Sequence, residues 1–153
     1  WAALKGAHVV HLDASKTSVA WARENAQLSQ AQDLPIRWIV DDVRKFVARE
    51  KKRGSKYHGV LLDPPSYGRG KSKEVWKIED DLYPLLEDIR QILAPDASFV
   101  QLSSHSPFFT PLTLSHLMAK AMKLPLKQIK GQEMKVPSPS GDLPAGFVCR
   151  YDS

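Results

Sequence analysis

Residues 8–26, HVVHLDASKTSVAWARENA, contain the pattern that decides the fold. A short run rich in β-branched residues ends at the acid Asp13, and Ser15 is a residue type that caps helix N-termini. Val19 and Ala26 then recur at the spacing of one helix face. The stretch therefore predicts a strand that ends near Asp13 and a helix that follows Ser15 directly.

The rest of the chain repeats this alternation of short strands and helices. We predict strands at 7–12, 36–40, 58–62, 97–103, 126–134 and 146–151, and helices at 15–29, 43–54, 79–93 and 111–124. Strands that alternate with helices are typical of α/β folds with a mainly parallel sheet. The last two strands are joined by a loop and are expected to form a hairpin-like pair.

The composition suits a single globular domain, because the chain has 153 residues of which 42% are hydrophobic. No apolar run approaches the roughly 18 residues that cross a bilayer, and no signal-peptide pattern is present. Cys149 is the only cysteine, which excludes an intrachain disulfide and a multi-cysteine metal site. The lack of a membrane span and of a signal peptide predicts a cytoplasmic protein. The histidines show no metal-ligand spacing, so we predict no bound metal.

The formal net charge of +5 is compatible with a polyanionic partner, since Lys and Arg displace counterions from phosphates. The cations gather in three segments, 49–56, 69–73 and 123–130. Such runs usually form a solvated face, so the charge favours nucleic acid only slightly.

Three acids stand at or just after the ends of successive predicted strands, namely Asp13, Asp42 and Asp63. Open α/β sheets bind ligands outside the carboxyl ends of their strands, so these acids are expected to converge on one crevice. Asp13 could accept both hydroxyls of a ribose, and Asp42 an adenine amino group with Val43 against the ring. Asp41 competes with Asp42 for this role. The alternative is that Asp13 and Asp42 are helix caps.

The third acid opens the stretch LLDPPSYGRGKSKE, residues 61–74. Pro64 and Pro65 fix an extended backbone and are expected to leave carbonyls free for a ligand. Asp63 and the Pro64 carbonyl could then accept hydrogen bonds from a substrate N–H, while a base stacks on Tyr67. After these residues come two glycines that let the chain bend and three cations that could meet phosphates: Gly68, Gly70, Arg69, Lys71 and Lys73. The alternative is a proline-stiffened loop with a buried tyrosine.

These segments resemble the class I S-adenosylmethionine-dependent methyltransferases. The segments HVVHLDASKTSVAWARENA, IRWIVDDVRKFVAREKKRG and LLDPPSYGRG are together similar to the ribosomal RNA large-subunit methyltransferase family. That family carries D-A-S-K, a D-D or D-V pair and D-P-P-x-aromatic after successive strands. The resemblance implies a Rossmann-like, mostly parallel sheet with a reversed last strand.

The resemblance also implies S-adenosylmethionine as cofactor and assigns roles to individual residues. Asp13 would bind its ribose and Asp42 its adenine, and the residues from Asp63 to Tyr67 would lie between donor and acceptor. The family's first strand and glycine-rich loop would precede Trp1, so residues 1–153 are interpreted as one catalytic domain that is truncated at its N-terminus.

Residues 101–106, QLSSHS, bear on the chemistry of the acceptor. Family members that methylate C5 of cytosine use a cysteine near this point, where this chain has Ser103 and Ser104. A nitrogen of a ribosomal RNA base is therefore favoured as the acceptor. The remaining alternative is an RNA-binding module with a degenerate cofactor site, since the glycine-rich loop is not in this sequence.

Overall fold

The computed structural model describes residues 1–69 and 75–153, which form two compact units. The first unit is Trp1–Arg49 and the second is Glu50–Ser153. The boundary falls within one helix, α2, which spans Val43–Arg53. Each unit is described by itself.

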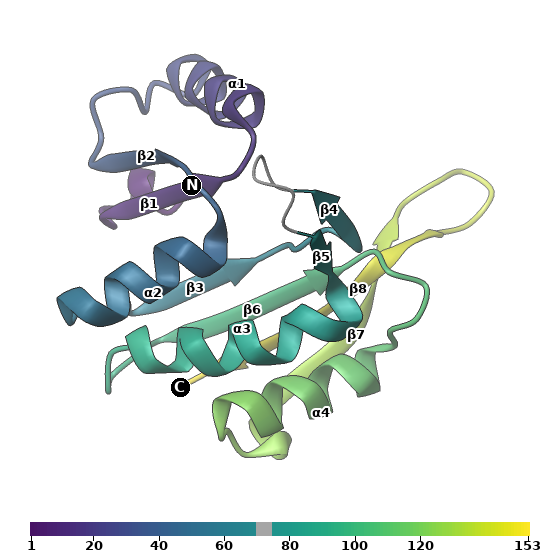
Figure 1. Ribbon diagram of the computed structural model, residues 1–153. Coiled ribbons are helices and arrows are strands. Elements are labelled where there is room, and N and C mark those ends of the chain that lie inside the picture. The colour runs from purple at the N-terminus through teal and green to yellow at the C-terminus, as the bar shows by residue number, and fades with distance from the viewer. Residues whose placement is uncertain (70–74) are drawn as a thin grey trace. The chain divides into compact units, whose positions relative to one another are not determined.

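The first unit is a two-stranded parallel sheet with a helix packed against it (Figure 1). Its elements are the 3₁₀ helix η1 (Ala3–Lys5), strand β1 (Val9–Asp13), helix α1 (Lys16–Leu28), strand β2 (Ile36–Val40) and the first part of α2. The predicted cap is confirmed, because the Ser15 side chain accepts a hydrogen bond from the Ser18 N–H at 3.2 Å. Val19 is the buried residue of α1, as the helical spacing predicted.

The second unit holds a four-stranded sheet with the order β3-β6-β8-β7. Its elements are β3 (Gly59–Leu62), β4 (Tyr67–Arg69), β5 (Val75–Lys77), α3 (Ile78–Ile92), β6 (Phe99–Ser104), α4 (Pro111–Met122), the 3₁₀ helix η2 (Leu126–Gln128), β7 (Ile129–Val136) and β8 (Leu143–Asp152). β3 and β6 run parallel, whereas β8 is antiparallel to both β6 and β7. The predicted reversed last strand and its pairing with the preceding strand are confirmed.

The core of the second unit lies where α3 and α4 cover one face of this sheet (Figure 1). Helix α3 buries a row of apolar side chains along one face, and buried residues of β6 alternate with half-exposed ones. The large aliphatic and methionine side chains that are fully buried are Ile78, Leu82, Leu86, Ile89, Val100, Leu102, Leu114 and Met118. Each such side chain contributes about 1.5 to 3 kcal/mol by leaving water, so this packing fixes the strand ends that carry the polar residues.

A short antiparallel hairpin, β4–β5, forms where the sequence predicted only loop. Gly68 lies opposite Trp76 in this hairpin, so it belongs to a strand instead of providing the expected bend. The other predicted loop positions, Gly70, Lys71 and Lys73, lie outside the described residues.

Within residues 1–69 and 75–153, no helix is both long enough and apolar enough to cross a bilayer.

Candidate active site

Asp13 ends β1 and fixes the turn into α1. Its Oδ1 accepts a hydrogen bond from the Ser15 N–H at 2.6 Å, so the carboxylate holds the backbone just before the helix. The Asp41 N–H donates to the Asp13 carbonyl at 3.1 Å, which brings the ends of β1 and β2 side by side. In the part of the chain that the structure describes, no residue bonds to Asp13 Oδ2. That oxygen is therefore open to a ligand, and the role of Asp13 toward a ribose stays a prediction.

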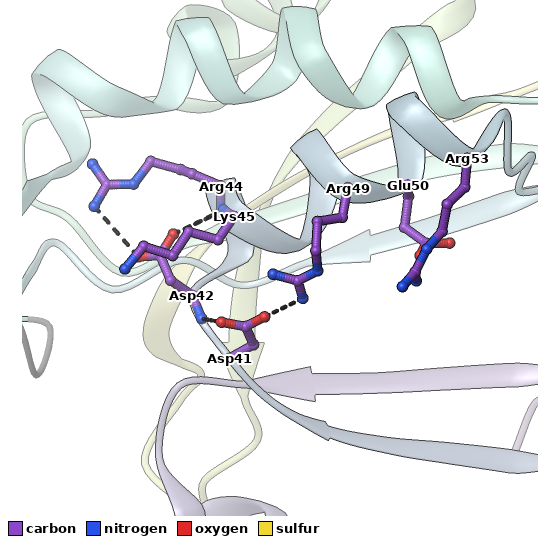
Figure 2. Close-up of polar contacts among 7 residues, drawn as sticks. All are labelled: Asp41, Asp42, Arg44, Lys45, Arg49, Glu50 and Arg53. Atoms are coloured by element: carbon purple, nitrogen blue, oxygen red, sulfur yellow. Dashed lines mark hydrogen bonds and ion pairs between the residues drawn. The ribbon is translucent and has the colours of Figure 1, made fainter.

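Asp42 caps helix α2. Its Oδ1 accepts from the N–H groups of Arg44 at 2.9 Å and Lys45 at 3.2 Å, and its Oδ2 pairs with the Arg44 guanidinium at 3.4 Å (Figure 2). Partial burial alone would raise the pKa of Asp42, but the Lys45 and Arg44 hydrogen bonds outweigh it and lower the pKa below its ordinary value. Asp42 is thus an ionised cap, with Val43 beside it as the first residue of the helix.

Both carboxylate oxygens of Asp41 also have partners within the protein. Its Oδ1 accepts from the Asp42 N–H at 2.8 Å, and its Oδ2 pairs with Arg49 (Figure 2). The helix-cap alternative is therefore correct for Asp42, which accepts from two N–H groups of α2. The Arg44 contact is half-buried and long, at 3.4 Å, and a role of Asp42 toward a cofactor stays a prediction.

Asp63 differs from these acids because its side chain is 66% exposed and no N–H of the neighbouring described residues holds its carboxylate. Asp13 and Asp42 each accept from the N–H two residues later. The corresponding residue after Asp63 is Pro65, and the one between is Pro64, so neither can donate. The proline pair thus leaves the Asp63 carboxylate projecting from the end of β3 for a partner outside the backbone.

One side chain does reach Asp63. The Ser103 hydroxyl, from the end of the neighbouring strand β6, donates to Asp63 Oδ1 at 2.6 Å. This bond orients the carboxylate and leaves Oδ2 for a ligand. Ser103 therefore supports Asp63 at the position where a catalytic thiol was considered. Its neighbour Ser104 is fully buried and accepts from the Ser106 N–H at 3.2 Å.

The hairpin fixes the loop that follows Asp63. Trp76 is buried, and its indole N–H donates to the Pro65 carbonyl at 2.7 Å. The expectation that the proline carbonyls are free is therefore wrong for Pro65. Tyr67 is 50% exposed, which contradicts the alternative of a buried tyrosine, and its hydroxyl accepts from Arg69 at 2.8 Å. The exposed ring can act as a stacking platform for a base, with Arg69 beside it.

The basic segments differ in whether their cations are paired within the protein. In segment 49–56, four cations bind the protein's own groups: Arg49 pairs with Asp41, Lys51 with Asp88, Arg53 with Glu50, and Lys56 with the Gln91 carbonyl. The lysines of segment 123–130 are exposed. They precede or begin β7, at the end of the sheet opposite to Asp63, because Ile129 is level with Tyr151 and Val100. Neither segment therefore lies beside the Asp63 carboxylate as a free basic patch.

The structure brings the predicted site residues together in two groups. Asp13, Asp42 and Val43 lie in the first unit, whereas the residues from Asp63 to Tyr67 lie in the second. The convergence of all three acids on one crevice stays a prediction. Within residues 1–69 and 75–153, no three His, Cys, Asp or Glu side chains are grouped as metal ligands.

His105 is a further residue of the second group. Its Nε2 lies 3.7 Å from Asp63 Oδ1. From the sequence, its position after the predicted strand at 97–103 indicated that it could face the crevice, although a structural or solvent-facing histidine was the favoured interpretation.

Comparison with known proteins links this arrangement to methyltransferases. Ribosomal RNA large subunit methyltransferase I of Aeromonas salmonicida is 34% identical over 73 residues, which are 46% of this chain and 18% of that protein. Methyltransferase K/L of Vibrio cholerae, from the same ribosomal RNA group, is 27% identical over 90 residues, 58% of this chain and 12% of that protein. The matches thus cover less than a fifth of the curated relatives. No family model matches the chain.

Solved structures agree with this relationship. An S-adenosylmethionine-dependent methyltransferase from Agrobacterium tumefaciens is 34% identical, with a TM-score of 0.90 over 99% of this chain and 50% of that one. An O-methyltransferase from Bacillus cereus shares the fold at a TM-score of 0.52 and 11% identity, over 97% of this chain and 64% of its own. The chain has the α/β fold of class I methyltransferases and resembles the ribosomal RNA large-subunit group.

Proposed function

We propose that the protein is an S-adenosylmethionine-dependent methyltransferase that methylates a base of ribosomal RNA. The observation that carries this proposal is the Asp63 carboxylate, which projects from the end of β3 with Ser103 on one oxygen and the exposed Tyr67 in the same loop. A carboxylate acceptor beside an aromatic face suits a flat ligand with N–H donors, which describes a nucleobase. The relatives named above support the same activity and substrate.

S-adenosylmethionine supplies a methyl group bonded to a positively charged sulfur. Asp13 would hold its ribose through Oδ2, and Asp42 would accept from its adenine with Val43 against the ring. Asp63, Pro64, Pro65 and Tyr67 would position the acceptor base next to it. Both compact units then belong to one catalytic domain, and a ribosomal RNA substrate places the protein in the cytoplasm.

The acceptor atom is proposed to be a nitrogen. Methylation of cytosine at C5 requires a thiolate that adds to the ring, and Cys149 is the only thiol of the chain. Cys149 is fully buried in β8, and burial raises the pKa of its thiol to about 12. A neutral, inaccessible thiol is a poor nucleophile. Ser103, whose hydroxyl donates to Asp63, is no substitute for it.

Two measurements on the full-length protein test the proposal. Calorimetry should detect binding of S-adenosylmethionine, and the protein should transfer radiolabelled methyl groups to an unmodified large-subunit ribosomal RNA transcript of the source organism. Nucleoside mass spectrometry of the product should identify an N-methylated base. A module with a degenerate cofactor site would bind the RNA without binding S-adenosylmethionine. Covalent trapping of Cys149 by RNA that contains 5-fluorocytosine would instead establish transfer to C5.

A further inference from the structure

The imidazole of His105 stands beside the Asp63 carboxylate at the carboxyl ends of β6 and β3. Its Nε2 lies 3.7 Å from Asp63 Oδ1, and 62% of the side chain is exposed. That separation is too long for a direct hydrogen bond. It does allow an N–H group of a ligand to approach both Nε2 and the carboxylate, since each is an acceptor when the imidazole is neutral.

The neighbouring strand is shaped to accommodate this ring. Gly146 of β8 has φ +95°, a conformation that L side chains rarely adopt. A Cβ at position 146 would lie 2.6 Å from the Ser104 carbonyl oxygen and 2.9 Å from His105 Nδ1. No real Cβ makes such contacts, so glycine is required for the ring and strand to sit as they do.

The backbone before the ring is fixed as well. Ser104 is fully buried, and its hydroxyl accepts from the Ser106 N–H, which closes a turn around His105. The Ser103 hydroxyl holds Asp63 on the other side. The backbone at His105 and the Asp63 carboxylate are thus each held by a separate hydrogen bond, while both side chains remain open to solvent.

We propose that His105 is a catalytic residue that takes the proton released by the acceptor nitrogen, an inference that rests on the proposed methyl transfer. The nitrogen lone pair forms the bond to the methyl carbon, the electron pair of the broken carbon–sulfur bond stays on sulfur, and the N–H proton passes to His105 Nε2. Asp63 stabilises the imidazolium that results, and the exposed ring then releases the proton to water.

This role narrows the substrate class. Only a nitrogen that carries a hydrogen has a proton to give up on methylation. The acceptor is therefore an exocyclic amine or a ring N–H of a base, and not a ring nitrogen that has only a lone pair.

A second pair in the same unit provides a matched control. His58 Nε2 lies 3.6 Å from Asp96 Oδ1, and the His58 side chain is 68% exposed. His58 precedes β3 and Asp96 precedes β6, so this pair lies at the amino ends of the two strands that carry the other pair at their carboxyl ends. The two histidines have the same chemistry and exposure, and they differ in their position on the sheet.

The first test does not depend on turnover. Diethyl pyrocarbonate acylates exposed imidazoles, and mass spectrometry reports each histidine separately. With S-adenosylhomocysteine and the unmodified large-subunit ribosomal RNA transcript bound to the full-length protein, we expect modification of His105 to slow at least about 5-fold and that of His58 to stay unchanged. Equal modification of His105 with and without the RNA would overturn the proposal.

The second test is chemical rescue. His105→Ala should lower turnover by about 10²-fold and leave the affinity for S-adenosylmethionine unchanged, whereas His58→Ala should be as active as the wild type. Added imidazole should restore part of the activity of His105→Ala, because free imidazole can take the proton. A loss without rescue, or no loss at all, contradicts the inference and leaves the proposed function intact. A wild-type protein that methylates no RNA overturns both.

Discussion

The acids after β2 and the acid after β3 have the same position at a strand end, but they differ in how far protein groups occupy their carboxylate oxygens. Asp41 and Asp42 are followed by a helix, whose free N–H groups and arginines bind their oxygens. Asp63 is followed by two prolines, which have no N–H to offer, and it remains 66% exposed. The comparison indicates that the residues after a strand-end acid decide whether it stabilises the fold or stays available to a ligand.

Removal of Asp63 should give the largest effect on activity. Asp63→Ala deletes the carboxylate that accepts from the base, and we expect turnover to fall by about 10²- to 10³-fold. The affinity for S-adenosylmethionine should change less than about 2-fold, because the proposed cofactor contacts come from Asp13 and Asp42. Single-turnover kinetics and calorimetry separate the two quantities. A variant that loses cofactor affinity and keeps turnover would reverse the assigned roles.

Removal of Asp42 should affect binding and stability together. Asp42→Ala loses the helix cap, which is expected to lower the free energy of unfolding by about 0.5 to 2 kcal/mol. If Asp42 also accepts from the adenine, cofactor affinity should fall by about 5- to 150-fold, which corresponds to 1 to 3 kcal/mol. Asp42→Asn is the control, because asparagine caps helices as well as aspartate does. Unchanged affinity in the folded Asp42→Ala variant would leave this acid with capping alone.

Glu50 extends the comparison to an acid used only for structure. It is 2% exposed and accepts from the Tyr57 hydroxyl and the Arg53 guanidinium, each at 2.8 Å. Burial would raise the pKa of Glu50, but hydrogen bonds from Tyr57, Ser55 and Arg53 lower it below the ordinary value of 4.5. A carboxylate with a lowered pKa stabilises the fold above its unfolded pKa, and this contribution is lost as the pH falls through the native pKa.

Glu50→Gln should therefore lower the free energy of unfolding by about 1 to 3 kcal/mol at pH 7. The difference from wild type should narrow at an acid pH below 4.5, as the pH falls through the lowered native pKa of Glu50 and the wild-type carboxylate becomes protonated. Urea unfolding at both pH values measures this, with the exposed Glu87→Gln as a control that should change stability by less than about 0.5 kcal/mol. A loss that is equal at both pH values would show that the charge of Glu50 does not stabilise the fold.

Local patterns in the sequence predicted most of the fold. The β2 strand and the cap at Ser15 depend on neighbouring residues, whereas the reversed last strand was implied by the family resemblance, and all three are confirmed. The β4–β5 hairpin was missed because it depends on pairing across the chain and on the bond from Trp76 to the Pro65 carbonyl.

The candidate site was predicted only in part, because local motifs reveal some of its residues and contacts between distant residues determine the others. Asp63 and Tyr67 were identified from their motif, and the structure leaves both exposed. The contribution of Ser103 depends on the alignment of β6 with β3, and that of His105 on space left by Gly146 in β8. Such contacts join residues about 40 positions apart, and no local pattern reveals them.

The central claim is that the proline pair keeps the Asp63 carboxylate available, and Pro65→Ala tests it most directly. This substitution creates an N–H two residues after Asp63, as in the Asp13 and Asp42 turns, and it keeps the carbonyl that binds Trp76. We predict a loss of turnover of about 10-fold, the size of one competing hydrogen bond, in the wild-type background and none in an Asp63→Ala background. Wild-type turnover in Pro65→Ala, or the same loss in both backgrounds, would contradict the claim.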